Sequence, residues 1–251
     1  MLRLTATVAA LGTAFALYAG APAFAADAAA AAISDASRPE ADRAADADRK
    51  PADMLTFAGL KAGDKVADLM PGGGYFTRIF SKAVGANGKV YAVVPEEFLK
   101  VRATAGDAIK AIAADAGYKN VTVVTVPLAA FKPAEPLDVV WTSRNYHDYH
   151  NKMFGPLDMA AYNKAVFAAL KPGGVYIVLD HTAAAGSGFE ATETLHRVDP
   201  EAVKKEVLAA GFKLDSESSV LKSTADDHTG KVFDSGVRGH TDQFVLKFRK
   251  P

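Results

Sequence analysis

The chain has 251 residues, 49% of them hydrophobic, and its 29 basic and 29 acidic side chains give a formal net charge of zero. A chain of this length and composition can bury one substantial core, which predicts a single folded domain. The charge balance leaves no basic excess for a nucleic-acid partner. The chain has no cysteine, which excludes disulfides, zinc–thiolate sites and anchoring as a lipoprotein.

Residues 1–25 have the pattern of a secretory signal peptide. Arg3 supplies a positive start, and residues 4–18 are apolar and rich in alanine. Pro22 then interrupts this run just before the small-x-small cleavage pattern Ala-Phe-Ala at 23–25. The apolar run is too short for a transmembrane helix. We therefore expect cleavage after this segment and a periplasmic or secreted mature protein that does not engage the membrane.

Residues 26–47 are rich in alanine, aspartate and arginine, and we expect this segment to be a flexible lead-in, above all in its first part. A helix can begin near Arg38, because Pro39 and the acidic Glu40 suit a first helical turn. Residues 48–251 are then expected to form the folded domain.

Apolar runs of strand length alternate with helical patterns along most of this domain. Strands are expected at 66–69, 89–94, 121–126, 137–142 and 175–180, with a sixth beginning at 212 and a seventh at 242–248. Helices are predicted after the first, second, fourth and fifth strands, whereas no helix is predicted between the last two. The pattern predicts a Rossmann-like, doubly wound α/β fold with a mainly parallel seven-stranded sheet and an antiparallel edge hairpin.

The stretch 66–75 reads Val-Ala-Asp-Leu-Met-Pro-Gly-Gly-Gly-Tyr and leads from the first strand into a helix. A turn of this kind lets a ligand approach the backbone closely, with the N–H groups of the helix aimed at it. Asp68, at the end of the strand, can accept hydrogen bonds from that ligand. The alternative is a tight turn that only packs a helix on a sheet, but three glycines after a proline exceed what a turn requires.

This stretch resembles the first motif of class I S-adenosylmethionine (SAM)-dependent methyltransferases, an acidic residue followed after two positions by alternating glycines. Gly72 and Gly74 stand at the second and third glycine positions, whereas Met70 replaces the first glycine. The resemblance implies that Asp68 and the loop pass beneath the methionine part of SAM. The loop residues concerned are Met70, Pro71, Gly72, Gly73 and Gly74.

Two further positions depart from that family. An acidic residue usually ends its second strand and holds the cofactor ribose, but Val94 stands there in this chain. Glu96 or Glu97 can take over that role, or both can simply form the acidic first turn of the next helix. Past the third strand the family often has an acidic residue near the adenine, where this chain has Leu128. Loss of the ribose contact would weaken binding about 10- to 100-fold.

Two polar segments follow strands four and five. Residues 143–151 read Ser-Arg-Asn-Tyr-His-Asp-Tyr-His-Asn, and residues 180–182 read Asp-His-Thr. Open α/β sheets bind ligands beyond the carboxyl ends of their strands, so both segments are expected beside the glycine loop. The run Arg-Asn-Tyr-His-Asp is also similar to a group of predicted secreted methyltransferases.

Methyl transfer to oxygen or nitrogen needs an aligned acceptor and a base that removes its proton. His147 is the candidate base, because the pKa of histidine is ordinarily near neutrality. Asp148 or Asp180 is expected to orient it. Asn145 and His181 complete the catalytic set, and Asp180 is also a candidate cofactor contact. Arg144 can hold an anionic group of the substrate. Trp141 or Tyr146 can stack on a planar group of the substrate. Each has a structural alternative, in which the aromatics are core residues, Arg144 pairs with Asp148, and the Asp180–His181 pair caps its strand.

Two other functions use the same residues. His147, His150 and His181, with Asp148 or Asp180, are possible zinc or manganese ligands of a hydrolase, although their spacing matches no helical ligand motif. A binding module without turnover is the second alternative, because three family contacts are altered and export separates the chain from cytoplasmic SAM. The leading hypothesis is a SAM-dependent methyltransferase that acts on a small-molecule acceptor.

Overall fold

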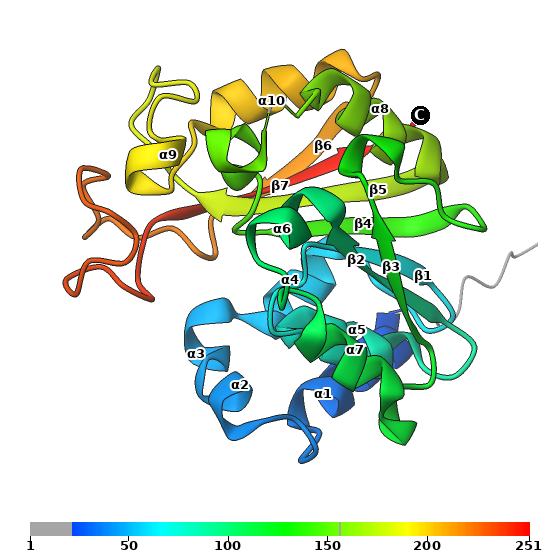
Figure 1. Ribbon diagram of the computed structural model, residues 1–251. Coiled ribbons are helices and arrows are strands. Elements are labelled where there is room, and N and C mark those ends of the chain that lie inside the picture. Colours follow the sequence, from blue (N-terminus) through cyan, green and yellow to red (C-terminus); the bar gives the residue numbers. More distant parts are fainter. Residues whose placement is uncertain (1–21, 156) are drawn as a thin grey trace, which may run out of the picture.

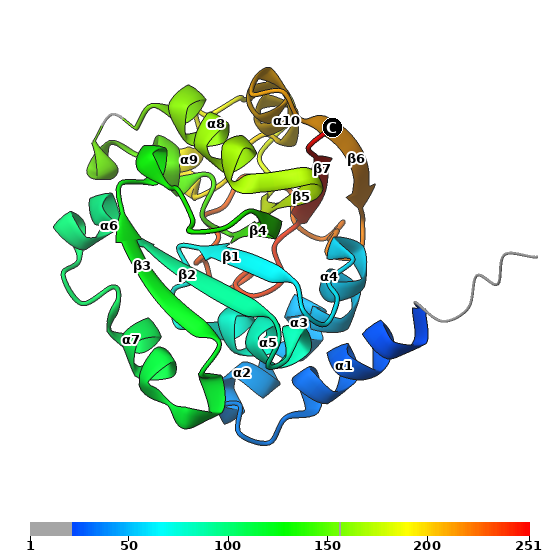
Figure 2. The same ribbon diagram turned by 90° about the vertical axis from the view of Figure 1, so that its right-hand side faces the viewer.

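The computed structural model describes residues 22–155 and 157–251, which form one seven-stranded sheet between two layers of helices (Figures 1 and 2). The strands are β1 (Lys65–Leu69), β2 (Lys89–Pro95), β3 (Val121–Val126), β4 (Leu137–Ser143), β5 (Leu170–His181), β6 (Lys213–Ser218) and β7 (Gln243–Arg249). The α-helices are α1 (Pro22–Ser34), α2 (Glu40–Ala44), α3 (Asp46–Arg49), α4 (Pro51–Ala58), α5 (Tyr75–Val84), α6 (Glu96–Val101), α7 (Asp107–Ala114), α8 (Met159–Ala169), α9 (Thr192–Leu195) and α10 (Pro200–Ala209). No helix in these two ranges is long and apolar enough to cross a membrane.

The strands are ordered β3-β2-β1-β4-β5-β7-β6, and β7 runs antiparallel to both of its neighbours. The other neighbouring pairs are parallel. This arrangement confirms the predicted mainly parallel sheet with an antiparallel edge hairpin. The chain builds outward from β1 to β3 and then crosses back to β4, so β1 and β4 flank the point where the strand order reverses. Open α/β sheets bind ligands at that point.

Successive side chains of the central strands point to opposite faces of the sheet and pack in two separate hydrophobic cores. Val66 and Trp141 lie in the core beneath α5, whereas Ala67 and Val140 lie in the core beneath α8. Figure 2 shows these layers edge-on, with α1, α4, α5 and α7 on one side of the sheet and α8 and α10 on the other. The central strands β1, β2 and β4 are mostly apolar because both of their faces are buried.

The predicted strand positions agree with the structure except at the start of β5. The sequence predicts a turn through Lys171, Pro172, Gly173 and Gly174, but β5 already begins at Leu170. Gly173 has a φ of +79° there, and the register against β4 shifts before Val139. The turn-like residues therefore form an irregular start of the strand rather than a separate loop.

The segment expected to be a flexible lead-in, residues 26–47, is mostly helical, which corrects that expectation. Alanine has the highest helix propensity, and α1 also packs against α5, with Ala32 only 2% exposed. Arg38 is 1% exposed and donates two hydrogen bonds to the carboxylate of Asp46, at 2.8 and 2.6 Å. Burial and this ion pair therefore hold the segment in place. The predicted signal peptide lies outside the described residues up to residue 21, and its cleavage site falls within α1.

Candidate functional site

A cavity of about 350 Å³ lies at the carboxyl ends of β1 and β4. Its walls come from the loop after β1, the loop after β4 and the helices α2 and α3. Its polar lining consists of Asp42, Arg49, Asp68, Ser143, Arg144 and Asn145. Specific pockets for small molecules have about this size and often occupy this place in α/β sheets. The structure thus brings the glycine loop and the first part of the polar segment after β4 together, as the sequence predicts.

Met70 occupies the position where the resembling motif has its first glycine, and its backbone adopts the conformation of a glycine. Its φ is +55°, a left-handed conformation that costs a residue with a side chain about 1–2 kcal/mol. The Met70 N–H donates to the carbonyl oxygen of Val93 at 2.9 Å, and its side chain lies in the core beneath α8. Met70 thus takes the left-handed backbone that a glycine at this position would adopt without cost.

The two motif glycines have different surroundings. Gly72, with a φ of +57°, lines the cavity, and a Cβ there would meet no atom of the protein within 4 Å. Gly74, with a φ of +82°, lies against α7, and a Cβ there would overlap the Cδ1 of Ile112. Gly74 does not line the cavity. The structure therefore corrects the expected cofactor contact at Gly74, which is required for close packing between α5 and α7.

Asp68 places a buried carboxylate on the cavity wall. The side chain is 3% exposed, and its Oδ2 accepts a hydrogen bond from the Thr77 hydroxyl at 2.7 Å. Burial raises the pKa of Asp68 to about 7, against the opposing effects of Thr77 and of the Arg49 charge. The described residues thus compensate the negative charge of Asp68 only in part. A cationic group of a ligand would supply the missing positive charge.

Two guanidinium groups line the same cavity. Burial lowers the pKa of Arg144 to about 10, so the group remains cationic at neutral pH. Its Nε donates to Gln243 Oε1 at 2.9 Å, so the alternative pairing with Asp148 is not formed. The Arg49 guanidinium lies 4.4 Å from the centre of the Tyr75 ring. Sequence reasoning missed Arg49, because nothing in its local pattern indicates that α3 folds over the glycine loop.

Asn145 connects the loop after β4 to the glycine loop. Its Nδ2 donates to the carbonyl oxygens of Met70 at 2.9 Å and of Leu69 at 3.4 Å. These bonds hold the two loops at a fixed separation, and the side chain also lines the cavity. Asn145 is thus a positioning residue at the place where the sequence predicts a functional one.

His147 is held between two carboxylates. Its Nδ1 lies 2.8 Å from Asp180 Oδ1, its backbone N–H donates to Asp180 Oδ2, and its Nε2 lies 3.2 Å from Asp148 Oδ1. Burial acts to lower the pKa of His147, but the two carboxylates outweigh it and raise the pKa to about 10. The imidazole is therefore already protonated at neutral pH. This corrects the expectation of His147 as a general base, which requires a pKa near neutrality.

Asp180 and Glu96 do not line the cavity, in contrast to their expected roles as cofactor contacts. Asp180 is fully buried and also accepts the backbone N–H of His181 at 2.7 Å. Glu96 begins α6, and the Glu97 carboxylate accepts the N–H of Leu128 at 3.2 Å, so the alternative of an acidic helix start is the one observed.

The remaining candidates from the ends of β4 and β5 are buried residues, namely Trp141, Tyr146 and His181. Trp141 is completely buried, with its ring centre 4.7 Å from that of Phe76. Tyr146 is also completely buried, and its hydroxyl donates to Glu206 at 2.6 Å. Burial lowers the pKa of His181 well below its ordinary value, so this imidazole is neutral. None of the three lines the cavity, which confirms the structural alternative for Tyr146.

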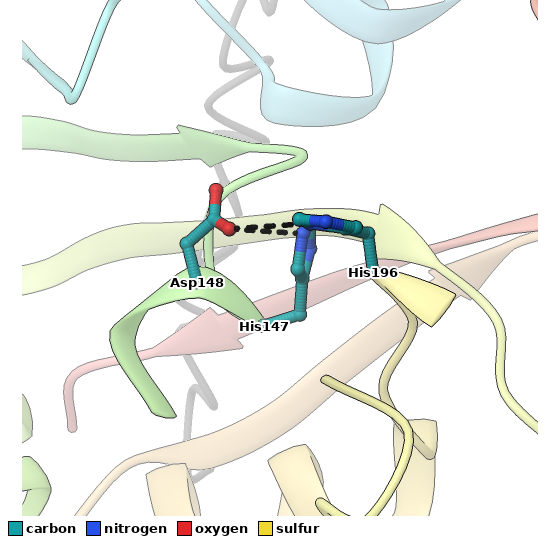
Figure 3. A group of neighbouring side chains, drawn as sticks. All are labelled: His147, Asp148 and His196. Carbon is teal, nitrogen blue, oxygen red and sulfur yellow. Dashed lines mark ion pairs between the residues drawn. The ribbon is translucent and has the colours of Figure 1, made fainter. Parts of the chain in front are cut away.

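The histidines expected as a metal set do not form a group of three converging ligand atoms, although the ring centres of His147 and His181 are 6.1 Å apart. His150 stacks on Phe189, and its Nε2 lies 3.2 Å from Glu206. His181 Nδ1 instead lies 2.7 Å from the Thr241 hydroxyl. In their place, His196 approaches the pair formed by His147 and Asp148 (Figure 3). No spacing signal could have identified His196, because it follows α9, far along the chain.

Comparisons with known proteins agree with this architecture. No protein-family model matches the chain. A protein-L-isoaspartate O-methyltransferase of Ignicoccus hospitalis is 33% identical over 88 residues, which are 35% of this chain and only 39% of that enzyme. The chain therefore matches well under half of the length of this curated relative.

Solved structures of low identity share the fold. A SAM-dependent methyltransferase from Aquifex aeolicus is 18% identical, with a TM-score of 0.55 over 79% of this chain and 88% of its own. The [4+2]-cyclase SpnF is also 18% identical, with a TM-score of 0.57 over 84% and 81%. The chain thus has the Rossmann-like fold of SAM-dependent methyltransferases. The name of the second protein shows that this fold also serves other reactions.

The packing role of Gly74 predicts a specific energetic coupling. Gly74→Ala should destabilise the protein by more than the roughly 1 kcal/mol that a left-handed backbone costs an alanine, because the new methyl group overlaps Ile112. Ile112→Val removes the overlapping Cδ1 and should recover part of that loss. A double-mutant cycle in urea measures this coupling. Gly72→Ala serves as the control, because its new methyl group meets no neighbour. If Gly74→Ala cost the same free energy of unfolding in the wild type and in the Ile112→Val variant, the packing role would be contradicted.

The raised pKa of Asp68 predicts a pH-dependent cost. Between the unfolded pKa of 3.8 and the folded pKa of about 7, the folded state binds more protons, so this carboxylate destabilises the fold increasingly as the pH rises. Asp68→Asn should therefore increase the free energy of unfolding, and its advantage should grow from about pH 4 to pH 7 and then level off. Urea denaturation across this range tests it. Replacement of the exposed Asp107 by Asn should show no such growth.

Proposed function

We propose that this protein binds SAM in the cavity between β1 and β4 and transfers its methyl group to a small-molecule acceptor. The observation that carries the proposal is the composition of this cavity. One buried carboxylate and two guanidinium groups face a single space beside a glycine loop, at the switch point of the sheet. The fold shared with SAM-dependent methyltransferases supports it.

The charges of the cavity complement the methionine part of SAM, which carries one ammonium and one carboxylate group. Asp68 would hold the ammonium, which compensates its buried charge. Arg49 and Arg144 are placed to hold the carboxylate. The open space beside Gly72 allows the ligand to reach the backbone.

Bound SAM supplies a sulfonium methyl group, which needs only an aligned nucleophile. The residues of this chain would act mainly by position. Asn145 fixes the loop after β4 against the glycine loop, and Asp180 fixes His147 behind it. Because His147 is protonated, it does not deprotonate an acceptor. The acceptor is therefore activated in another way or is nucleophilic already.

Calorimetry with SAM and with S-adenosylhomocysteine tests the proposal. Both ligands should bind the wild-type protein, and Asp68→Asn should weaken binding by about tenfold, the value of one charge-assisted hydrogen bond. The matched control is Asp64→Asn, because Asp64 precedes the opposite end of β1 and its side chain accepts a hydrogen bond only from the Lys61 N–H among the described residues.

Two results would contradict the proposal. One is the failure of both adenosyl ligands to bind at millimolar concentration. The other is an equal loss of affinity in the Asp68 and Asp64 variants, which would place the ligand elsewhere. Incubation with isotope-labelled SAM and a panel of small hydroxyl and amine compounds then tests turnover by mass spectrometry.

We propose further that the protein is exported. The apolar run of residues 4–18, followed by Pro22 and the cleavage pattern at 23–25, supports this. Cleavage there would remove only the first residues of α1 and leave Ala32, which packs in the core, in place. Mass spectrometry of protein from the periplasm should find an N-terminus near Ala26. An intact N-terminal methionine on protein confined to the cytoplasm would contradict export.

A further inference from the structure

Three potential metal-ligand atoms converge at the start of the 3-10 turn Asp148–His150, in the loop after β4 whose first residues line the cavity. They are His147 Nε2, one carboxylate oxygen of Asp148 and His196 Nδ1, and all lie within 4.8 Å of one another. Both imidazoles approach the same oxygen, Asp148 Oδ1, at 3.2 and 3.6 Å. Figure 3 shows the two rings and the carboxylate pointing toward one common region.

The first imidazole is oriented as a metal-binding histidine is. His147 Nδ1 is bonded to the buried carboxylate of Asp180 at 2.8 Å, so its Nε2 is directed at the cluster. A carboxylate that holds the far nitrogen of a ligating imidazole is the usual outer support of such sites. Asn151 Nδ2 donates to Asp148 Oδ1 at 3.1 Å and fixes the carboxylate in the same way.

The second imidazole is brought in by the left-handed backbone at the end of α9. His196 follows α9 with a φ of +57°, a conformation in which histidine is found more often than most residues with a side chain. The contacts of His147 with Asp148 and Asp180 do not require His196. Its ring nevertheless stands edge-on to that of His147, with centres 5.4 Å apart.

We propose that His147, Asp148 and His196 form a binding site for a divalent transition-metal ion, which displaces the proton from the His147 imidazole when it binds. Two imidazoles and one carboxylate suit Zn²⁺, Co²⁺ or Fe²⁺, and three protein ligands leave coordination positions open. The side chains of Asp148 and His196 are 18% and 29% exposed, so an ion and a further ligand can reach the site from solvent. This ligand set differs from the one that the sequence suggests.

The open positions suit an oxygen donor of the methyl acceptor, and this part of the inference rests on the proposed function. A bound metal ion would lower the pKa of a coordinated hydroxyl group, whose proton would pass to solvent water. The resulting oxyanion would take the methyl group of SAM, and S-adenosylhomocysteine would leave. The acceptor class is then a small molecule with a metal-binding hydroxyl group.

Titration of untagged, EDTA-treated full-length protein with Zn²⁺ tests the site without SAM or acceptor. The wild type should bind one ion, whereas His196→Asn should reduce the affinity by about tenfold or more. Asparagine tolerates the left-handed backbone, so the variant should remain folded. Asp148→Asn, which keeps an oxygen for Asn151, should cause a similar loss.

The matched control is His240→Asn, because His240 forms a comparable pair with Asp48 but is 73% exposed and lies outside the cluster. Its affinity for Zn²⁺ should equal that of the wild type. Wild-type affinity in the His196 variant, equal losses in all three variants, or no binding at submillimolar Zn²⁺ would overturn the proposal. Thermal denaturation of each variant confirms that it is folded.

A second titration tests the open positions. Co²⁺ replaces Zn²⁺ as the probe, because its visible absorption reports the ligand set. Addition of acetohydroxamate, a small oxygen chelator, should change that spectrum while the ion stays bound. An unchanged spectrum would contradict a site open to oxygen donors. The outcome is independent of SAM binding, so a failure here and a failure of the proposed function are distinguishable.

Discussion

The arrangement of the polar segments after β4 and β5 depends on the hydrogen bonds of the buried Asp180 carboxylate. This carboxylate is fully buried at the end of β5 and accepts the backbone N–H groups of His147 and His181, while it also bonds the His147 ring. A buried carboxylate without such partners would be very costly. The loop after β4 is thus held to the end of β5. That arrangement fixes the direction of the His147 ring and, through it, the geometry of the cluster with His196.

The topology of the sheet and the loop after β4 together determine where the two candidate sites lie. The cavity between β1 and β4 lies at the strand reversal, and its walls combine Asp68 with two guanidinium groups. The loop after β4 lines this cavity with Asn145 and then turns away to present His147 at the second site. Because Asn145 bonds the Met70 carbonyl oxygen, the two sites keep a fixed relation. Such a relation is needed wherever a donor and an acceptor must align.

The burial of Asp68 costs stability and is most easily understood as a requirement of ligand binding. Burial raises the pKa of this carboxylate to about 7, and only the Thr77 hydroxyl bonds it directly among the described residues. A core without function would carry an apolar or uncharged residue here. Proteins commonly keep such unfavourable groups where a ligand supplies the missing partner. The left-handed Met70 in the adjoining loop is a second local cost at the same place.

The architecture could be predicted from the sequence because it depends on local patterns. Apolar runs with both faces buried indicate parallel strands, and the start of α5 after three glycines indicates the ligand loop. Asp158 and Asp199 cap α8 and α10, as their places before the helices predict. The cavity lining at Asp68, Gly72, Arg144 and Asn145 was predicted in the same way, because strand ends in an α/β sheet meet at one edge.

Burial and partners between distant segments were decided only by tertiary structure. The residue type of His147 suggests a base, yet the carboxylates of Asp148 and Asp180, from two different segments, raise its pKa to about 10. Gly74 belongs to a binding motif, but Ile112 of α7 determines its role. Arg49 and His196 reach the sites because α3 folds over the loop and α9 ends in a left-handed turn. A side chain's charge state and neighbours depend on what packs around it, and that is not encoded in local spacing.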